Sequence, residues 1–484
     1  MDIAKMVVHQ ARSREYEPAI AFAGGIATSG MLMRAVASAC EQIERAGLVR
    51  GSIVAVDTRN PFFHVALALA LELQGICSAS VQTAYSIRQS GLVPAAILVD
   101  GTSEHDSAVR TILVDASWFT TDLQAPADFA QLLAMPGFAD DDAMARIVFS
   151  SGTTGVPKST GFSPAVIERR ISHNLIVFGG GVAGVRIGTM MGFSTLAGYI
   201  LPMTALAAGG TICFGSNPHE MLHLLRSLRV DVLMTAVGQL NALLDALGNA
   251  RAPDIGLLVV NGSKLPSPLL ARARERLSAN LAFAYGSTEA GVLSQAPASL
   301  LEGTEGVAGY LLPWVQMQVV DADDNVLPSG AEGVIRVRTP DQGRYLLDDP
   351  ENAAFLRDGW FYPGDVGQLR ADGLVTITGR SVEVINRGGS VVAPELIERV
   401  LTQRPDITDA AAFGVRGPTG MEEIWAAVVS TRTINEAELV LFCREQLADK
   451  APNVIHQVVS IQRTEAGKIR RVQTRDAVVA ARSV

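Results

Sequence analysis

Short apolar runs alternate with longer helical patterns along the first three hundred residues of the chain. The apolar runs have the length expected of buried strands, and one longer apolar segment, Pro61–Gln74, predicts a helix. We predict buried strands over Ser52–Asp57, Ala96–Val99, Arg146–Phe149, Asp231–Thr235, Ile255–Val260 and Leu281–Tyr285. Strands that alternate with helices predict an α/β fold in which helices flank β-sheets.

The pattern changes after about residue 300. Polar turn sequences then separate β-rich runs at Val315–Val320, Gly333–Arg338 and Leu374–Thr378. The last hundred residues mix helices and strands, which we expect near Pro394–Arg404, Ala410–Val415, Ala426–Ser430 and Glu436–Leu447. We therefore predict a large N-terminal domain over residues 1–379, with a β-rich subdomain at about 300–379, and a small, mobile α+β C-terminal domain over residues 380–484.

Composition narrows the class of protein. With 484 residues, of which 48% are hydrophobic and 18% charged, the chain is expected to fold into two or more domains. Its net charge of −9 argues against a broad phosphate-binding surface, so nucleic acid is excluded as a partner. The four cysteines lie far apart in the sequence, which is typical of reduced thiols in a cytoplasmic protein and not of disulfides or a zinc site. We expect a monomer or a homodimer.

One long segment carries no Asp, Glu, Lys or Arg, from Ile187 to His219. A membrane-spanning helix needs about 20 consecutive apolar residues, and several glycines, Ser194 and Pro202 interrupt this segment. A buried loop, helix and strand in an α/β core explains the segment better, so we predict no membrane span.

A loop rich in glycine and hydroxyl groups follows the predicted strand Arg146–Phe149. Its two glycines let backbone N–H groups approach an anion, its hydroxyls add donors and its lysine adds a positive charge, so the loop suits a polyphosphate. The candidate binding residues are Ser150, Ser151, Gly152, Thr153, Thr154, Gly155 and Lys158. The spacing differs from that of the Walker loop, and an ordinary turn between a strand and a helix is the alternative.

Five segments resemble, in the same order, the motifs of the adenylate-forming superfamily, which includes acyl-CoA synthetases, firefly luciferase and the adenylation domains of peptide synthetases. They are SSGTTGVPK (150–158), AYGSTEAG (284–291), GWFYPGD (359–365), GRSVEVINRGGSVVAPELIE (379–398) and TEAGKIRR (464–471). The resemblance spans roughly residues 20–475 and is closest to acyl- or aryl-CoA ligases. It implies that ATP and Mg²⁺ activate a carboxylic acid as an acyl-adenylate, whose acyl group then passes to a thiol.

The resemblance also implies which residues bind the nucleotide. Tyr285 would stack on adenine, Thr288 would contact phosphate and Glu289 would bind Mg²⁺, tasks that suit a flat ring, a hydroxyl and a carboxylate. Thr288 and Glu289 are therefore candidate catalytic residues. Further nucleotide-binding candidates are Gly262, Ser263, Gly286, Ser287, Asp365, which would accept hydrogen bonds from the ribose hydroxyls, and Arg380.

The C-terminal segments imply the rest of the reaction. Lys468 matches the family's catalytic lysine, whose charge bridges the substrate carboxylate and the α-phosphate. Gly388 and Gly389 match the segment that lines the narrow tunnel for a pantetheine thiol. Before the lysine motif, Gln462 stands where the family has Pro. Two further positions depart from the family: Val382 stands at the hinge, which is usually Asp or Lys, and Leu396 replaces a usual Glu. These two departures concern the domain rotation that precedes thiol transfer.

The acyl pocket is expected in three segments of the large domain, Phe193–Tyr199, Asn261–Lys264 and Ala290–Val292. Its candidate residues are Phe193, Ser194, Gly198, Tyr199, Ala290 and Gly291. Ser194 stands where amino-acid adenylation domains usually carry Asp, and Ala284 stands where synthetases for malonate-like diacids tend to carry Arg. An aryl acid or a short to medium acyl chain therefore suits the pocket better than an α-amino acid or a diacid.

The sequence thus predicts an AMP-forming acyl- or aryl-CoA ligase that uses ATP, Mg²⁺ and CoA. Two alternatives remain open. One is a stand-alone adenylating ligase that loads an acyl group onto the pantetheine of a carrier protein. The other is a non-catalytic nucleotide-binding protein on the same fold, which Val382 and Leu396 suggest.

Overall fold

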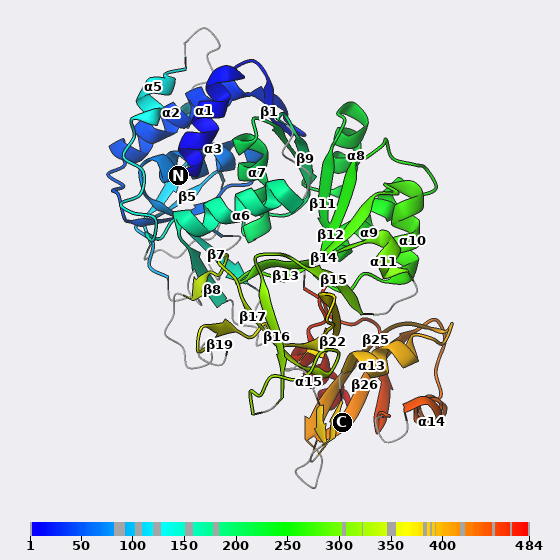
Figure 1. The fold of residues 1–484 in the computed structure, drawn as a ribbon. Coiled ribbons are helices and arrows are strands. Elements are labelled where there is room, and N and C mark those ends of the chain that lie inside the picture. The colour runs from blue at the N-terminus through cyan, green and yellow to red at the C-terminus, as the bar shows by residue number, and fades with distance from the viewer. Residues whose placement is uncertain are drawn as a thin grey trace. The chain divides into compact units, whose positions relative to one another are not determined.

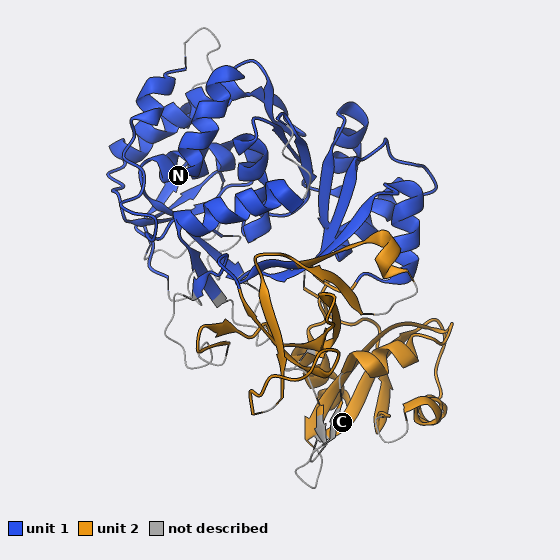
Figure 2. Cartoon of the chain, viewed as in Figure 1, with its two compact units in different colours: residues 1–261, 265–293, 339–352 blue, residues 262–264, 294–338, 353–484 orange. Residues whose placement is uncertain are grey.

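The chain folds into two compact units, which Figure 2 shows in blue and orange. The first comprises residues 1–261, 265–293 and 339–352, and the second comprises residues 262–264, 294–338 and 353–484. The computed structural model describes residues 2–81, 92–101, 109–119, 127–150, 158–177, 183–302, 306–321, 323–345, 355–380, 385–387, 390–392, 394–416, 422–447, 451–464 and 467–482. Both helices and strands occur in each unit, which confirms the predicted α/β class.

One sheet of the first unit has seven strands in the order β18-β8-β7-β4-β3-β5-β6. The strands are β3 (Ile53–Asp57), β4 (Cys77–Ser80), β5 (Ala96–Val99), β6 (Thr111–Leu113), β7 (Arg146–Ser150), β8 (Lys158–Phe162) and β18 (Arg344–Tyr345). Five of them run parallel, whereas β8 is antiparallel to β7 and β18 is antiparallel to β8. The first three predicted strands are therefore confirmed, with ends within one residue of those expected.

The second sheet of the first unit places strands in the order β13-β12-β11-β9-β10-β1-β2. They are β1 (Pro18–Phe22), β2 (Gly25–Thr28), β9 (Arg186–Thr189), β10 (Thr211–Phe214), β11 (Val232–Ala236), β12 (Leu257–Asn261) and β13 (Leu281–Ser287). All but β2 run parallel, so the carboxyl ends of β9, β11, β12 and β13 lie along one edge. Ligands of α/β folds bind at such an edge.

Helices cover the faces of these sheets, as Figure 1 shows. They are α1 (Ile3–Ser13), α2 (Ser29–Arg45), α3 (Pro61–Leu73), α5 (Phe129–Leu133), α6 (Pro164–Val177), α7 (Leu196–Ala207), α8 (Pro218–Ser227), α9 (Val237–Leu247) and α10 (Ser267–Arg276). A 3₁₀ turn lies at Ala116–Trp118. Helices α3 and α7 are apolar on nearly all sides and are almost wholly buried, because α3 packs on α2 and β4 while α7 packs on α1, α6 and β10. Any polar group on them must find a partner inside the core.

Strand β14 (Gly291–Pro297) begins in the first unit, and its residues from Ser294 onward belong to the second unit. The short helix α11 (Ala298–Leu301) comes next. It is followed by antiparallel strands: β15 (Val307–Leu311), β16 (Gln316–Val320), β17 (Glu332–Arg338), β19 (Leu356–Arg357), β20 (Trp360–Phe361), β21 (Asp365–Leu369) and β22 (Leu374–Arg380). The C-terminal part contains β23 (Ile385–Arg387), β24 (Ser390–Val392), α13 (Pro394–Leu401), β25 (Ile407–Arg416), β26 (Glu422–Ser430), α14 (Glu436–Leu447), β27 (Val454–Gln457) and α15 (Arg471–Arg482). The predicted domain boundary at residues 379–380 falls at the end of β22 and stays a prediction.

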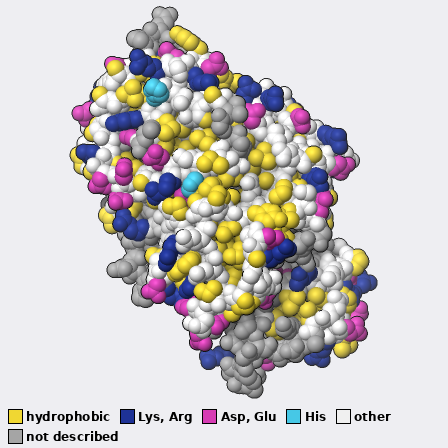
Figure 3. Space-filling view, in the orientation of Figure 1, with side chains coloured by type: hydrophobic (Ala, Val, Ile, Leu, Met, Phe, Trp, Pro, Cys, Tyr) yellow, Lys and Arg dark blue, Asp and Glu magenta, His cyan; other side chains and the backbone are white. Residues whose placement is uncertain are grey.

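The uncharged segment forms β9, α7 and β10, as predicted, and these elements are buried. Among the described residues, no helix is both long and apolar enough to span a bilayer. The four cysteines are free and buried, and burial raises the pKa of Cys40, Cys77 and Cys213 to about 12. On the face drawn in Figure 3, basic and acidic side chains are interspersed, so neither sign of charge gathers there in one patch.

Candidate active site

The phosphate loop joins two paired strands. Ser150 ends β7, Lys158 begins β8, and the two residues are partners in the antiparallel register. The loop therefore leads into a strand and not into a helix, and the choice between an ordinary turn and a phosphate site stays open. The residues that complete the loop, Ser151, Gly152, Thr153, Thr154 and Gly155, lie outside the described residues, so their predicted phosphate contacts stay predictions.

The motif at Tyr285 forms the end of β13 and a tight turn into β14. Tyr285 is half-buried, and the Ala290 N–H donates to the Ser287 hydroxyl at 3.1 Å inside the turn. Both positions favour glycine, for different reasons: a Cβ at Gly286 would lie 2.1 Å from the Gly291 carbonyl oxygen, whereas Gly291 has φ +80°. Thr288 and Glu289 lie at the tip of this turn, outside both strands, and both are half-buried.

A buried arginine on helix α6 holds the backbone of this turn. The Arg170 guanidinium donates to the carbonyl oxygen of Thr288 at 3.0 Å, to that of Glu289 at 2.8 Å and, through Nε, to that of Asp341 at 2.9 Å. Its carbon lies 4.7 Å from the centre of the Phe162 ring, at the end of β8. Burial lowers the pKa of Arg170 to about 10, so the side chain remains a cation at neutral pH.

We call the segment Thr339–Tyr345 the strap, and we call the strands β7 and β8 the phosphate-loop hairpin. The strap contacts both this hairpin and the turn at Thr288 and Glu289. The Gly343 N–H donates to the Glu289 carbonyl oxygen at 2.7 Å, and the next two residues form β18, which pairs with β8. Asp341 of the strap is 2% exposed, and its carboxylate is 2.7 Å from Nδ1 of His173 on α6. Two motifs that lie more than a hundred residues apart in the chain are thereby joined within the first unit.

The first segment of the predicted acyl pocket is the loop before α7. Phe193 is half-buried, and its ring stacks on the buried His64 ring with centroids 4.0 Å apart and planes 9° apart. Ser194 is also half-buried, and Thr195 caps α7 by accepting from the Gly198 N–H at 3.0 Å. Gly198 must be glycine, because a Cβ there would lie 2.0 Å from the Gly192 carbonyl oxygen. Whether these residues contact an acyl group stays a prediction.

A polar network lies behind this loop inside the apolar core. Arg146, 0% exposed, donates to the hydroxyls of Ser78 and Ser80 and, at 2.9 Å, to the Phe193 carbonyl oxygen. Its guanidinium carbon lies 4.4 Å above the ring of Tyr199, so the two pack as a cation–π pair. Arg146 thus fixes the backbone that carries Phe193.

Tyr199 links the network to helix α3. Its hydroxyl donates to the Glu72 carboxylate at 2.7 Å, and the Ala4 N–H donates to the other oxygen at 3.1 Å. Burial raises the pKa of Glu72 to about 7, and burial lowers that of His64 to about 3, so His64 is neutral. Tyr199 is 3% exposed, which places its hydroxyl in the core.

Of the remaining residues of the predicted pocket, Ala290 ends the turn after β13 and Gly291 begins β14. Ala290 is 0% exposed and Gly291 is half-buried. Because Arg170 and the strap hold this turn, they also hold these two residues.

In the second unit, two predicted nucleotide-binding residues lie opposite each other. Asp365 begins β21 and Arg380 ends β22, and they are partners in the antiparallel register. Gly262 and Ser263 follow β12 directly, and Gly262 has φ +94°, which favours glycine. Their contacts with a nucleotide stay predictions.

Lys468 is exposed and lies at a tight turn between Arg463 and Ile469, which form an isolated bridge. The Lys468 N–H donates to the Thr464 hydroxyl at 3.1 Å, and its carbonyl accepts from the Thr464 N–H at 2.8 Å. Arg463 donates to the Asp409 carboxylate of β25 and to the Gly467 carbonyl, so the turn is tied to the sheet of the C-terminal part. The backbone at Lys468 is therefore fixed to the C-terminal part.

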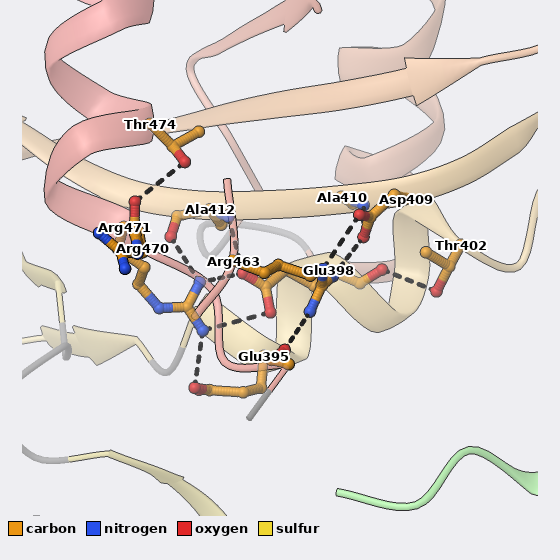
Figure 4. A network of polar contacts seen from close by, with 11 residues as sticks. Glu395, Glu398, Thr402, Asp409, Ala410, Ala412, Arg463, Arg470, Arg471 and Thr474 are labelled. Atoms are coloured by element: carbon orange, nitrogen blue, oxygen red, sulfur yellow. Dashed lines mark hydrogen bonds and ion pairs between the residues drawn. The ribbon is translucent and has the colours of Figure 1, made fainter. Parts of the chain in front are cut away.

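A second anchor follows Lys468, as Figure 4 shows. Arg471, the first residue of α15, pairs with Glu395 and Glu398 of α13 and donates to the Ala412 carbonyl oxygen of β25. The departure at Leu396 leaves both of these glutamates in place. Val382, Gly388 and Gly389 lie outside the described residues, so the hinge and the CoA tunnel stay predictions.

Among the described residues, no group of three or more His, Cys, Asp or Glu side chains could hold a metal ion. Mg²⁺ is usually bound through one or two carboxylates together with substrate phosphates and water. A single carboxylate at Glu289, on a turn joined to the phosphate-loop hairpin, fits that mode of binding.

Residues 7–345 match the family model of AMP-binding enzymes, and residues 396–468 match that of the AMP-binding enzyme C-terminal domain. The chain belongs to the AMP-binding enzyme family. These two matches confirm the predicted membership of the adenylate-forming superfamily.

Relatives of this AMP-binding protein include CoA ligases. It is 30% identical over 376 residues to YdaB of Bacillus subtilis, named provisionally as an acyl–CoA ligase, with 74% of each chain covered. It is 26% identical to the 2-succinylbenzoate–CoA ligase of Bacillus mycoides, with 92% of each covered. Its fold is similar to that of o-succinylbenzoate CoA synthetase from Bacillus subtilis in complex with ATP and magnesium (TM-score 0.84, 21% identity, 98% and 99% covered).

The sequence patterns missed the residues that support these segments. A charged or polar residue in an otherwise apolar element was the available signal: His64 and Glu72 interrupt the apolar helix α3, and Arg146 begins a buried strand. Arg170 carries no such signal, because α6 contains several polar residues.

Proposed function

We propose that this chain is an AMP-forming acid–thiol ligase that activates an aryl or a short to medium acyl acid with ATP and transfers the acyl group to CoA. The proposal includes a cytoplasmic location, which the four buried, free cysteines support. It also includes a monomer or a homodimer as the active form.

One observation carries the proposal. The strap and Arg170 join the phosphate-loop hairpin to the turn that holds Thr288 and Glu289. A phosphate-binding loop beside a hydroxyl and a carboxylate is the arrangement that a metal–triphosphate complex needs. The names of the relatives, which are CoA ligases, support the same activity.

In the first step, a carboxylate oxygen of the acid attacks the α-phosphorus of ATP, and pyrophosphate leaves. The backbone N–H groups and hydroxyls of the phosphate loop, together with Thr288, would bind the phosphates. Lys468 would place its ammonium between the carboxylate and the α-phosphate, where negative charge accumulates. Mg²⁺, bound through Glu289 and the phosphates, would neutralise part of that charge.

In the second step, the CoA thiolate attacks the carbonyl carbon of the acyl-adenylate, and AMP leaves. Gly388 and Gly389 would form the passage for the pantetheine arm. Val382 at the hinge concerns the domain rotation that precedes this step, so thiol transfer is the part of the proposal that this departure bears on.

An uncharged acyl group is the best match to the predicted pocket. The segments Phe193–Tyr199 and Ala290–Val292 contain no charged side chain, and the Phe193 ring offers an aromatic wall backed by the neutral His64. An aryl acid can stack on such a wall, which is worth about 0.5–1.5 kcal/mol beyond its area burial. A second substrate carboxylate has no partner in these segments.

Pyrophosphate release from ATP, measured with a panel of aryl and aliphatic acids, tests the proposal. We expect release with uncharged aryl or short acyl acids and a thioester when CoA is added. Release without any thioester would point to a carrier protein as the acceptor. An absence of release with every acid would refute the ligase and favour a non-catalytic nucleotide-binding protein.

A further inference from the structure

A single buried side chain, Arg170, contacts three segments that the proposed nucleotide site requires. It donates to the turn at Thr288 and Glu289, donates to the strap at Asp341 and packs over Phe162 at the end of the phosphate-loop hairpin. We propose that Arg170 is a positioning residue for Mg²⁺–ATP, because it fixes the backbone from which the Thr288 hydroxyl and the Glu289 carboxylate project. This inference rests on the proposed function, which assigns those two side chains to phosphate and metal.

The backbone of the turn needs an external partner. Thr288 and Glu289 lie outside β13 and β14, so their carbonyl oxygens are not part of a regular strand ladder. They are instead bonded by Arg170, and the Glu289 carbonyl also accepts from the Gly343 N–H of the strap. Without these bonds, the direction of the two side chains would depend on a short turn alone.

Only an arginine can make this set of contacts. Its planar guanidinium has five donors in a fixed fork, whereas a lysine ammonium is a point charge with rotatable donors. Arg170 uses Nε and both terminal nitrogens on three carbonyls from two segments. A lysine would keep the charge but could not hold the three carbonyls in one plane.

The charge of Arg170 is balanced within the same cluster. Asp341 is buried beside it and pairs with His173, which lies one turn further along α6. The guanidinium binds the main-chain oxygen of Glu289, so the contact fixes that residue without using its carboxylate. A metal ligand has to be held within about 0.5 Å of its working position, which a rigid hydrogen-bonded support provides.

The neighbouring residue Arg169 offers a matched control. It lies on the same helix and donates to the same strap, at the Pro340 carbonyl oxygen, with distances of 3.2 and 2.9 Å. Its hydrogen bonds go to Pro340 and not to Thr288 or Glu289. Replacing Arg169 therefore removes an arginine–strap contact while leaving the turn held.

The test is calorimetric binding of ATP with and without Mg²⁺, in the absence of acid and CoA, for wild type, Arg170→Lys, Arg170→Met and Arg169→Met. We expect Arg170→Lys to raise the Kd of Mg²⁺–ATP by at least about tenfold, the effect of losing one charge-assisted hydrogen bond. The Kd of metal-free ATP should rise by a smaller factor, because displacing Thr288 weakens one phosphate contact while the contact between Glu289 and the metal is absent in both proteins. Arg170→Met should lose more affinity for Mg²⁺–ATP than Arg170→Lys, and the Kd of Arg169→Met for Mg²⁺–ATP should stay within about twofold of wild type.

Three results would overturn the inference. The first is an unchanged affinity for Mg²⁺–ATP in folded Arg170→Lys. The second is a loss of affinity in Arg170→Lys that is equal for ATP with and without Mg²⁺. The third is a loss of Mg²⁺–ATP affinity in Arg169→Met as large as that in Arg170→Lys. If Arg170→Met does not fold, Arg170→Lys decides alone, with its melting temperature as the check on folding. A wild-type protein that binds no Mg²⁺–ATP would overturn both proposals, whereas one that binds it but releases no pyrophosphate would overturn only the ligase activity.

Discussion

Replacing Gly198 with alanine adds one methyl group and should displace the neighbouring backbone at Gly192 and Phe193. A Cβ at this position would lie 2.0 Å from the carbonyl oxygen of Gly192 and 3.0 Å from the amide nitrogen of Phe193. Real Cβ contacts essentially never fall below 3.0 Å, so the two backbones must separate by about 1 Å. The clash involves main-chain atoms on both sides, and therefore no side-chain rotation can relieve it.

The displacement should lower kcat/KM for the acid. Overpacking of this kind costs about 1–3 kcal/mol of stability, and a misplacement of about 1 Å in a group that orients a substrate can cost about 100-fold in rate. The moved peptide carries Phe193, the proposed aromatic wall. We expect kcat/KM for the acid to fall by roughly 10- to 100-fold, mainly through KM, with the affinity for Mg²⁺–ATP within about twofold.

Pyrophosphate exchange with varied acid at saturating ATP measures this effect. Gly101→Ala is the control, because a Cβ there meets nothing within 4 Å and the residue has an ordinary φ. A folded Gly198→Ala protein whose acid kcat/KM is within about twofold of wild type would refute the reasoning. An equal loss in Gly101→Ala would show that the effect is not local.

Three further changes have distinct expected outcomes. Lys468→Ala should abolish adenylation but leave thioester formation from a supplied acyl-adenylate largely intact, and equal loss of both steps would contradict its role. Glu72→Gln should have a higher melting temperature than wild type at pH 8 but not at pH 5. The pKa of Glu72 is raised from 4.5 to about 7, so its ionisation destabilises the folded state as pH rises through that window. A difference in melting temperature that does not depend on pH would contradict this. Arg471→Met should lower the melting temperature, because it strands the Glu398 carboxylate, while Mg²⁺–ATP binding stays unchanged.

Regular elements were predictable because their patterns are local. The helix Pro61–Gln74 and the strand Leu281–Tyr285 agree with α3 and β13 to within two residues, since apolar periodicity decides both. Strand β8 was missed, because KSTGF has no apolar alternation and is fixed by its pairing with β7. Such a strand depends on tertiary contacts that no local pattern encodes.

The candidate site was predictable to the extent that it consists of contiguous motifs. Tyr285 and Glu289 stand out as one short segment, and Asp365 becomes significant only through resemblance. The strap has no distinctive composition, and its contact with Glu289 joins residues 54 positions apart. Arg170 looks like an ordinary helix-surface arginine until the fold buries it.

The buried cysteines make the native chain suitable for site-specific labelling. Alkylating dyes react with the thiolate, which is scarce at neutral pH when burial raises the pKa of Cys40, Cys77 and Cys213 to about 12. A cysteine introduced at Leu441, 58% exposed in the second unit, would therefore take a maleimide dye without removal of the native thiols. A second dye at Val93, 84% exposed in the first unit, would allow energy transfer to follow the distance between the units during turnover.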